Sequence, residues 1–380
     1  MRLCMISPHL PPEQAANALL PVMLGEALSS HGMTTSYLSH PASNQSPFQR
    51  APDVTYVPRR GRDRFSRSTL GALLAGGRMA IGSRRLVSES DLVHLHGNGF
   101  IVEIGHQLAE RYRKPYVITL YGTDVWHHDP VRHARFARVV RESACRVFYS
   151  RGLHEFAQHL GLAPDPSVVI YAPVSPVFHR VEEEERQAIR RDLGAGDGPL
   201  LLTVKRLHPV AGHETLLEAM PQIVSRFPDA KLWLIGEGER RSALEGRARA
   251  LGVASRVGFL GRIDQESLWR YCAAADLFVL PSYLESWGTV MLEALACGTP
   301  VVATDTAGGV EVHDRFPDDV TLVEMRNPEA LAAAISGALA ARRRATQTTE
   351  QRLRTEFDVS HCAARYLAVY RQALENQHAI

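Results

Sequence analysis

Two glutamates eight residues apart, with a glycine between them, are the residues of this chain best suited to chemistry. Glu285 and Glu293 flank Gly288, and an apolar helical pattern follows that glycine. At a helix start the backbone N–H groups of Gly288, Thr289 and Val290 lack helical partners, so they can bind an anion such as a diphosphate. The two carboxylates can accept hydrogen bonds from hydroxyl groups. The stretch therefore predicts a site for a sugar nucleotide; the alternative is an ordinary helix start that favours acidic residues.

Composition indicates a soluble protein of two domains. The chain has 380 residues, 45% of them hydrophobic and 22% charged, and this length exceeds one ordinary hydrophobic core. A formal net charge of +2 argues against a dedicated nucleic-acid binder, which would carry a strongly basic domain. Residues 3–6 are predicted to form a buried strand rather than a signal peptide. The chain has no apolar run of about 18 residues, so no membrane span is predicted.

Cysteines and potential metal ligands give no sign of a metal site. The five cysteines are scattered and form no Cys-x-x-Cys pair, which is typical of reduced core residues in a cytoplasmic protein. The chain contains no Asp-x-Asp, and its histidines show no ligand spacing. We therefore expect a reaction that needs no metal ion and no cofactor.

Strand and helix patterns alternate along the chain, which predicts an α/β protein with parallel sheets. The predicted strands cover residues 3–7, 35–39, 92–96, 116–120, 146–149, 200–204, 231–235, 256–259, 277–280 and 300–303. The predicted helices cover residues 19–30, 101–113, 213–227, 239–251, 265–274, 289–297 and 329–342. These elements form two doubly wound, Rossmann-like domains, joined near residues 172–176, where two prolines stiffen the link. Because ligands bind outside the carboxyl ends of parallel strands, we expect the site in a cleft between two facing sheets.

The chain also resembles the retaining glycosyltransferases of family 4, which have the GT-B fold. The strongest match is residues 285–309, which are similar to the signature E-x-F-G-x-x-x-x-E-A-x-A-x-G-x-P-V-V-A-T, with Trp287 in place of its phenylalanine. Supporting matches lie at residues 203–209 before Gly212, 256–261, 120–124 and 11–13. The resemblance covers nearly the whole chain and implies transfer of a sugar from a nucleoside diphosphate sugar to a hydroxyl group.

The resemblance further implies roles for individual residues and domains. Glu293 would bind the donor ribose, Glu285 the donor sugar and Arg206 the diphosphate. Arg262 and Ile263 would lie near the base. Donor contacts are also expected from Trp287, Gly288, Thr289, Val290, His208 and Ala16. Residues 174–359 would form the donor-binding domain and residues 1–173 the acceptor-binding domain, with a final helix in residues 360–380 that packs back on the latter.

One departure from the family pattern concerns the diphosphate. The family usually has a lysine immediately before the glycine of the arginine-containing loop, and this chain has Ala211 there. Loss of one charge-assisted contact would slow turnover roughly ten- to a hundredfold if nothing replaced it. We expect Lys205, His208 or His213 to replace it, and we include Lys205 with Arg206 among the predicted catalytic residues.

Two further departures lie in the first domain. Ala15 and Ala16 stand where the family has paired glycines that let the backbone approach the phosphate. Tyr121 replaces a histidine that is usual beside the donor sugar. A phenol can still donate a hydrogen bond, although at neutral pH it is neither a cation nor a ready base. Tyr121 therefore stays a predicted catalytic residue.

His96 and Asp124 are candidates for contact with the acceptor. His94 and His96 lie at the end of a predicted buried strand, where ligands bind; the alternative is that they only hydrogen bond to the neighbouring loop. Asp124 follows Gly122 and Thr123. It either accepts a hydrogen bond from the acceptor hydroxyl or caps the next helix.

Two charged segments have less specific interpretations. From Arg59 to Arg85 the chain carries eight arginines and one acidic residue, Asp63. This composition predicts a surface that contacts anionic lipid or a charged acceptor at the inner face of a membrane, and the alternative is a solvated surface. The four glutamates at residues 182–185 are predicted to begin a solvated helix.

The sequence thus predicts a cytoplasmic glycosyltransferase that acts with retention and without a metal ion. Its partners would be a nucleoside diphosphate sugar and an acceptor hydroxyl on a glycan, a lipid carrier or a small metabolite. Two alternatives share the diphosphate site. A nucleotide-sugar epimerase of similar fold would react with the donor alone, and a catalytically weak binding protein would bind the sugar nucleotide without transfer.

Overall fold

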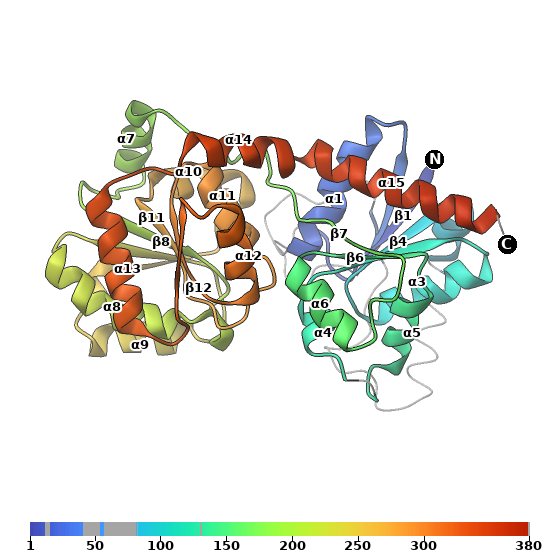
Figure 1. Cartoon of the computed structure of the whole chain (residues 1–380), viewed down its shortest axis with the longest axis horizontal. Helices are drawn as coiled ribbons and strands as arrows, with labels where there is room; N and C mark the ends of the chain where they lie inside the picture. The colour runs from blue at the N-terminus through green and yellow to red at the C-terminus, as the bar shows by residue number, and fades with distance from the viewer. Residues whose placement is uncertain (12–15, 41–53, 57–80, 82, 130, 379–380) are drawn as a thin grey trace. The chain divides into compact units, whose positions relative to one another are not determined.

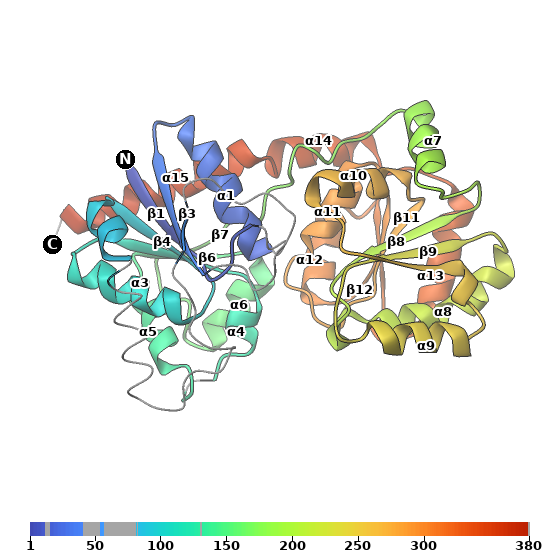
Figure 2. The ribbon, with the colours of Figure 1, turned by 180° about the vertical axis from the view of Figure 1, so that it is seen from behind.

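The computed structural model describes residues 1–11, 16–40, 54–56, 81, 83–129 and 131–378 (Figure 1). The chain divides into two compact units. Unit 1 consists of Met1–Pro173 and Val359–Ile380, and unit 2 of Val174–Asp358. Each unit is a parallel sheet covered by helices (Figures 1 and 2), so the predicted α/β class with two doubly wound domains is confirmed.

Unit 1 contains a seven-stranded parallel sheet in the order β3-β2-β1-β4-β5-β6-β7. Its strands are β1 (Arg2–Ile6), β2 (Thr34–Ser39), β3 (Val54–Tyr56), β4 (Leu92–His96), β5 (Tyr116–Leu120), β6 (Cys145–Phe148) and β7 (Ser167–Val169). Its helices include α1 (Ala16–Ser29), α3 (Phe100–Arg111), α4 (Thr123–Trp126), α5 (Ala134–Glu142), α6 (Arg151–His159) and α15 (Val359–His378). The central strands β4 and β5 are buried along their whole length, as expected for strands with both faces covered.

Unit 2 contains a six-stranded parallel sheet in the order β10-β9-β8-β11-β12-β13. Its strands are β8 (Leu200–Val204), β9 (Lys231–Ile235), β10 (Val257–Gly261), β11 (Leu277–Leu280), β12 (Val301–Thr304) and β13 (Val320–Val323). Its α-helices are α7 (Glu183–Asp192), α8 (His213–Arg226), α9 (Arg241–Ala250), α10 (Gln265–Ala274), α11 (Thr289–Ala296), α12 (Ala307–Arg315), α13 (Pro328–Ala341) and α14 (Gln347–Glu356). Two 3-10 turns, η1 (Pro209–Ala211) and η2 (Ala254–Arg256), complete it.

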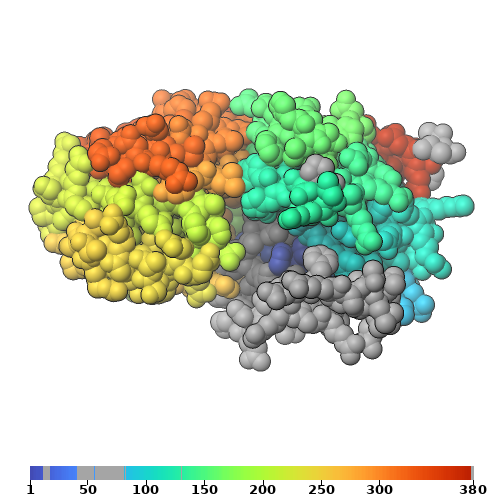
Figure 3. All heavy atoms as spheres, turned by 90° about the horizontal axis from the view of Figure 1, so that it is seen from below, coloured from blue at the N-terminus to red at the C-terminus, as the bar shows by residue number. Residues whose placement is uncertain are grey.

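The main core of unit 2 lies between its sheet and the helices α8 and α13. Leu216, Met220 and Ile223 recur at helical spacing on α8 and are fully buried, together with Val279 of β11 and Ile335 of α13. The helix α9 buries Leu244 and Ala248 in the same core, and its other residues belong to the yellow part of the surface in Figure 3.

The helix α15 belongs to unit 1 although it comes last along the chain. It packs against α1 and fully buries Tyr366 and Tyr370. The hydroxyl of Tyr370 hydrogen bonds to Nδ1 of His94 at 2.7 Å, and that of Tyr366 to Oγ1 of Thr119 at 3.0 Å. These bonds fix α15 onto the strands β4 and β5.

The strand order of each sheet shows where a ligand crevice opens. In a doubly wound sheet the crevice lies outside the carboxyl ends of the strands, at the point where the order reverses. This point falls between β1 and β4 in unit 1, and between β8 and β11 in unit 2. The loops after these four strands are therefore the segments that should form a site.

The predicted pattern lacks three short strands and the helices α5, α6, α12 and α14. The strands β3, β7 and β13 are three or four residues long, which is too short for a periodic signal. Residues 182–185 are exposed and α7 starts at Glu183, as predicted, but the later residues Arg186 and Arg190 are buried. None of the described helices is long and apolar enough to cross a membrane.

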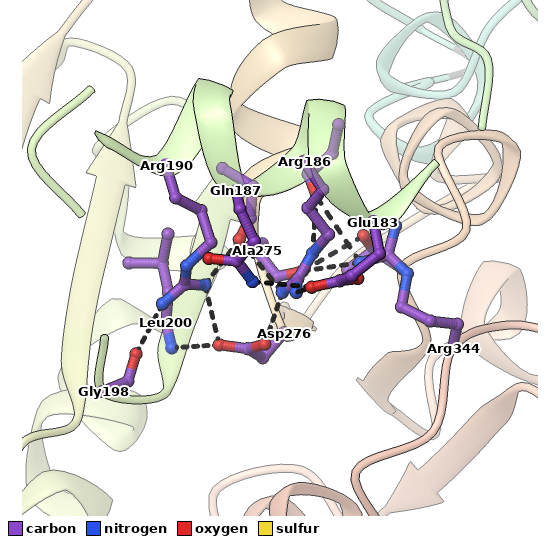
Figure 4. Close-up of polar contacts among 12 residues, drawn as sticks. Glu183, Arg186, Gln187, Arg190, Gly198, Leu200, Ala275, Asp276 and Arg344 are labelled. Atoms are coloured by element: carbon purple, nitrogen blue, oxygen red, sulfur yellow. Dashed lines mark hydrogen bonds and ion pairs between the residues drawn. The ribbon is translucent and has the colours of Figure 1, made fainter. Parts of the chain in front are cut away.

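Buried arginines hold α7 on unit 2 (Figure 4). Arg190 donates from Nη1 to Oδ2 of Asp276 at 3.0 Å and from Nη2 to the carbonyl of Gly198 at 2.7 Å. Arg186 also pairs with Asp276, and its Nε donates to the carbonyl of Ala273 at 3.1 Å. The last carbonyls of a helix have no helical partners, so these guanidinium groups satisfy the C-terminal end of α10.

Candidate functional site

An ion pair joins the ends of the two central strands at the switch point of unit 2. Lys205 directly follows β8, and its Nζ pairs with Oε2 of Glu285 in the loop after β11. The lysine side chain is 25% exposed and the glutamate side chain 11%. A carboxylate removed from water needs such a partner, because burial disfavours its charged form. Two predicted catalytic residues are therefore brought together in one crevice.

A glycine in the left-handed conformation leads the chain from Glu285 into α11. Gly288 has a φ of 73° and is the N-cap residue of that helix. A Cβ at this position would lie 2.6 Å from Cε of Met291 and 3.2 Å from Cγ of Glu285, so a larger residue would disturb the carboxylate. The N–H groups of Thr289 and Val290 lie in the first turn of α11, where a helix can bind an anion.

Glu293 lies in the next turn of α11 and is buried. Its exposed fraction is 7%, and burial raises its pKa to about 7, although a hydrogen bond from Gln265 lowers it. Near pH 7 this carboxyl group is therefore present in both its neutral and its charged form. Acids with such raised pKa values are common in functional sites. Sequence reasoning missed Gln265, because it lies 28 positions from its partner.

Two predicted cationic groups lie at the surface of unit 2. The side chain of Arg206 is 74% exposed, and its Nη2 lies 3.9 Å from Oε2 of Glu239. His208 approaches the same carboxylate, with Nε2 3.5 Å from Oε1. Both side chains follow β8, at the same end of the strand as Lys205. Their exposure leaves them open to contact with a ligand.

The predicted residues for the base, Arg262 and Ile263, directly follow β10. Nη2 of Arg262 lies 3.4 Å from Oε2 of Glu237 in the loop after β9, and Ile263 is half-buried. Gly236, which precedes Glu237, has no room for a side chain. A Cβ at this position would lie 2.2 Å from the carbonyl oxygen of Lys205. The glycine thus lets the ends of β8 and β9 come together.

Of the three residues predicted to replace the family lysine, Lys205 is the one that pairs with Glu285. Ala211 is fully buried in η1. His213 is 1% exposed, and neither ring nitrogen has a hydrogen-bond partner among the described residues. Burial lowers the pKa of His213 to about 4, with Glu214 raising it and Lys205 lowering it further, so the ring is neutral at pH 7. His208 is more exposed than Lys205, and which of the three residues takes the place of the family lysine stays a prediction.

The structure corrects one predicted donor contact. Trp287 is fully buried, and its ring lies 5.8 Å from that of Phe357 at an angle of 20°. The guanidinium of Arg315 lies 6.0 Å from the centroid of the indole ring. The indole is therefore part of the core of unit 2 and is not exposed for contact with a donor.

In unit 1, His96 and Tyr121 meet at the carboxyl ends of β4 and β5. The Nδ1 atom of His96 lies 2.7 Å from the hydroxyl of Tyr121. The Nε2 atom of the same ring is buried and has no hydrogen-bond partner among the described residues. Burial lowers the pKa of His96 to about 3 and raises the pKa of Tyr121 well above its ordinary value. Both side chains are therefore neutral at pH 7 and can offer hydrogen bonds without charge.

Asp124 holds the turn that carries Tyr121. Its carboxylate accepts hydrogen bonds from the N–H of Tyr121 at 3.0 Å and from the N–H of Gly122 at 2.7 Å. Burial raises the pKa of Asp124, whereas these backbone hydrogen bonds lower it. The predicted helix cap is wrong, because Asp124 lies within α4, whose N-cap is Gly122 without a side-chain cap hydrogen bond. Its carboxylate instead organises the backbone just before α4, and the acceptor contact stays a prediction.

His94 has the purely structural role that the sequence left open for it. Its Nε2 lies 2.8 Å from Oγ1 of Thr119, and its Nδ1 is engaged by Tyr370. The ring lies 3.9 Å from that of His96, centroid to centroid, and so supports it. Sequence reasoning missed Tyr370, because 276 positions separate it from His94.

Two predictions fall largely outside the described residues. Most of the arginine-rich segment does so; Arg84 and Arg85 are described and exposed, and Nε of Arg85 lies 2.9 Å from Oε1 of Glu89. In the N-terminal loop Ala15 is not described. Ala16 is the first residue of α1, and its side chain is not described.

One group of possible metal ligands occurs among the described residues. His106, Glu110 and Glu142 place their ligand atoms within 4.8 Å of one another. Arg138 already pairs with Glu110 at 3.1 Å and with Glu142 at 2.8 Å. A guanidinium thus neutralises both carboxylates, and the group is better described as an ion-pair network than as a metal site.

Comparisons with known proteins decide the family. A family model described as Glycosyl transferases group 1 matches residues 185–354, and one described as Glycosyltransferase Family 4 matches residues 22–178. A D-inositol 3-phosphate glycosyltransferase of Jonesia denitrificans is 31% identical over 305 residues, which are 74% of this chain and 71% of that one. The chain belongs to glycosyltransferase family 4.

Two other proteins agree with this assignment. An uncharacterized glycosyltransferase of Methanocaldococcus jannaschii is 31% identical over 264 residues, which are 67% of each chain. The crystal structure of Anabaena HepE in complex with UDP and glucose matches with a TM-score of 0.80 at 19% identity, covering 98% of this chain and 99% of that one. At this identity the likeness shows the fold, which is GT-B. This glycosyltransferase is thus an enzyme of the hexosyltransferase class, and the epimerase alternative is not supported.

Proposed function

We propose that this glycosyltransferase moves a hexosyl group from a nucleoside diphosphate sugar to an acceptor hydroxyl, with retention and without a metal ion or other cofactor. Unit 2 binds the donor and unit 1 the acceptor. The observation that carries the proposal is the Lys205–Glu285 ion pair beside the start of α11. A cation and a carboxylate that can accept hydrogen bonds from sugar hydroxyls thus accompany a helix end suited to an anion, which supports the proposal.

Each part of the donor has a matching group in unit 2. Lys205, Arg206 and the N–H groups at the start of α11 bind the diphosphate. Glu285 accepts hydrogen bonds from the sugar, and Glu293 from the ribose. The base lies near Arg262 and Ile263, which follow β10.

The chemical role of the cations follows from the charge that develops in the reaction. Negative charge grows on the leaving phosphate as its bond to the anomeric carbon breaks. Groups already aimed at that phosphate lower the barrier, because they need no reorganisation during the step. Lys205 and Arg206 supply positive charge that a metal ion supplies in other transferases, and this supports a metal-independent reaction.

The acceptor hydroxyl must also lose a proton when it attacks. His96 is a poor base, since burial lowers its pKa to about 3, and the carboxylate of Asp124 already accepts backbone N–H groups. The leaving phosphate oxygen therefore takes the proton on the same face of the sugar, which gives retention. His96 and Tyr121 contribute neutral hydrogen bonds that orient substrate hydroxyls.

The acceptor class is proposed from the family. The Jonesia relative is named for D-inositol 3-phosphate, so we favour a phosphorylated polyol, with glycans and lipid carriers as the other candidates. The segment from Arg59 to Arg85 would contact the phosphate of such an acceptor or anionic lipid. We propose that the enzyme is cytoplasmic and that it works at the inner face of a membrane when the acceptor is a lipid.

Thermal unfolding with nucleotides tests the donor site. In the presence of EDTA, one of UDP, GDP, ADP and TDP should raise the Tm of the wild type, because a ligand that binds the native state stabilises it. Glu293→Ala should abolish the rise. Gln222→Leu, at an exposed position of α8, should keep it. The absence of a rise with every nucleotide would overturn the proposal.

Product analysis tests the reaction itself. The glycoside formed from donor and acceptor should keep the anomeric configuration of the donor, as read from the coupling of its anomeric proton in NMR spectra. The rate should be the same with and without EDTA. An inverted product, or activity that EDTA abolishes and added metal restores, would contradict the proposed mechanism.

A further inference from the structure

Gln265 contacts Glu293 from a neighbouring helix. Its Nε2 donates a hydrogen bond to Oε1 of Glu293 at 2.9 Å, which links the start of α10 to α11. The backbone of Gln265 is held in place by the preceding residue, Asp264, which caps α10. Oδ1 of Asp264 accepts a hydrogen bond from the N–H of Ser267 at 2.6 Å. The amide therefore meets the carboxylate from a fixed position.

The surroundings of Glu293 make this hydrogen bond important. Burial raises the pKa of Glu293 to about 7, and the hydrogen bond from Gln265 acts in the opposite direction. The titratable group that faces Glu293 from α10 is Cys272. A hydrogen bond with Cys297 and burial raise the pKa of Cys272 well above its ordinary value, so this thiol stays neutral. The amide of Gln265 is thus the polar group that favours the charged carboxylate.

The ribose of a nucleotide presents two adjacent hydroxyl groups. A carboxylate has about four acceptor positions on its two oxygens, so one that already accepts from Gln265 can still accept from both hydroxyls. A 2'-deoxyribose offers one of these two donors. Orientation matters because a hydrogen bond weakens steeply when its angle departs from linearity.

We propose that Gln265 is a positioning residue for donor recognition, which aims the carboxylate of Glu293 at the 2'- and 3'-hydroxyls and so selects ribonucleoside over 2'-deoxyribonucleoside diphosphate sugars. This rests on the proposed function, because unit 2 must bind a nucleotide. It adds a residue and a class of donor to that function.

Donor binding is then coupled to the loss of a proton from the carboxyl group of Glu293. Two hydroxyl donors bind a charged carboxylate better than a neutral carboxylic acid, in which one oxygen carries a proton. The affinity for a ribonucleotide therefore rises with pH through the pKa of Glu293 and levels off above it.

Calorimetric titration of ribo- and deoxyribonucleotides tests the selectivity. UDP, GDP and ADP are each titrated into the wild type at pH 7.5, followed by the 2'-deoxy form of whichever binds. The ribo form should bind about tenfold or more tightly, as is typical of a hydrogen bond to a charged group. Gln265→Leu, which keeps the size but loses the donor, should reduce this preference to about two- or threefold. The exposed control Gln222→Leu should retain it.

The dependence of binding on pH shows whether Gln265 positions the carboxylate of Glu293 or whether its replacement disturbs the site in general. The ratio of ribo to deoxy affinity cancels the titration of the phosphate itself. In the wild type this ratio should rise between pH 6 and pH 8, with a midpoint near the pKa of about 7 for Glu293. The midpoint should move to higher pH in Gln265→Leu, and the pH dependence should vanish in Glu293→Gln.

The outcomes distinguish this inference from the proposed function. A wild type that binds no nucleoside diphosphate would overturn both. A wild type that binds ribo and deoxy forms equally, or a Gln265→Leu variant with the wild-type preference and midpoint, would overturn the role of Gln265 alone. Gln265→Glu, which replaces the donor with an acceptor of the same size, provides the same test if the leucine variant does not fold.

Discussion

Glu293 shows that a residue suited to binding can lower the stability of its own fold. Burial raises its pKa from 4.5 to about 7. Between these values the folded chain holds a proton at Glu293 that the unfolded chain has lost. The contribution of Glu293 to stability is therefore fully present below pH 4.5 and is lost as pH rises through about 7. A shift of this size corresponds to about 3 kcal/mol of lost stability at higher pH.

We therefore predict that Glu293→Gln stabilises unit 2 at alkaline pH. The amide keeps the shape of the side chain but carries no charge, so its free energy of unfolding at pH 8 should exceed that of the wild type by about 1 to 3 kcal/mol. At pH 5 the two proteins should be similar. Urea unfolding at both pH values measures this difference. A variant less stable than the wild type at pH 8 would mean that the charge of Glu293 is compensated in the native state.

Lys205 carries the second prediction at this scale. Lys205→Ala removes the cation that pairs with Glu285, so kcat/KM should fall roughly ten- to a hundredfold. The Tm should fall as well, because the carboxylate of Glu285 is left largely buried without its partner. Lys231→Ala is a matched control, because Lys231 begins β9 at the opposite end of the strand from the crevice. Steady-state rates of transfer measure both. Equal rates for the Lys205 and Lys231 variants would remove Lys205 from the catalytic residues.

At the scale of elements, residue spacing predicted the site residues that lie within one stretch of chain. It missed the contacts that these residues make with segments distant in the sequence. Glu285 and Gly288 could be predicted to form one site with Glu293, because the start of one helix positions all three. The partner of Glu293, Gln265, comes from another helix, and no periodicity relates the two. Trp287 was wrongly given to the donor because its partner in the core, Phe357, comes from a segment far along the chain.

The helix α7 shows how an element can be attached by charge. Arg190 is 4% exposed and bonds to Asp276 and to backbone carbonyls (Figure 4). Removal of one member of a buried ion pair costs about 3 to 5 kcal/mol, because the other charge stays buried without its partner. Arg190→Ala should therefore lower the free energy of unfolding of unit 2 by about 3 kcal/mol.

The neighbouring arginine provides the control for that experiment. Arg191 lies on the same helix but is exposed, so Arg191→Ala should change stability by less than about 0.5 kcal/mol. Guanidinium unfolding monitored by fluorescence compares the two variants. Similar losses in both would show that α7 is held by its apolar contacts rather than by the buried guanidinium groups.

At the scale of the whole molecule, the two units differ in how they are assembled from the chain. Unit 2 is one continuous segment, whereas unit 1 needs α15, which the chain reaches only after unit 2. Without α15, His94 and Thr119 would lose the partners Tyr370 and Tyr366 in the interior of unit 1. The packing of this last helix on the first domain was predicted from the family resemblance. The periodicity of the sequence did not predict it, because no local signal indicates a contact between residues so far apart in the chain.

Truncation tests this dependence. A chain that ends at Asp358 should keep the folded unit 2 but lose the cooperative unfolding of unit 1, and residues 174–358 alone should fold and bind a nucleoside diphosphate. Hydrogen exchange and calorimetry report each unit separately. Native-like protection of β4 and β5 in the truncated chain would show that α15 is dispensable for unit 1.

The position of α15 reverses the order in which the two units mature during synthesis. The residues of unit 1 leave the ribosome first, yet its final helix leaves after all of unit 2. At about 5 to 20 residues per second, this leaves the first unit incomplete for on the order of tens of seconds, while the second can fold as it emerges. Chaperones should therefore bind mainly to the N-terminal region of the nascent chain. A translation product that stops before α15 would expose the surface that this helix covers, which marks it for degradation.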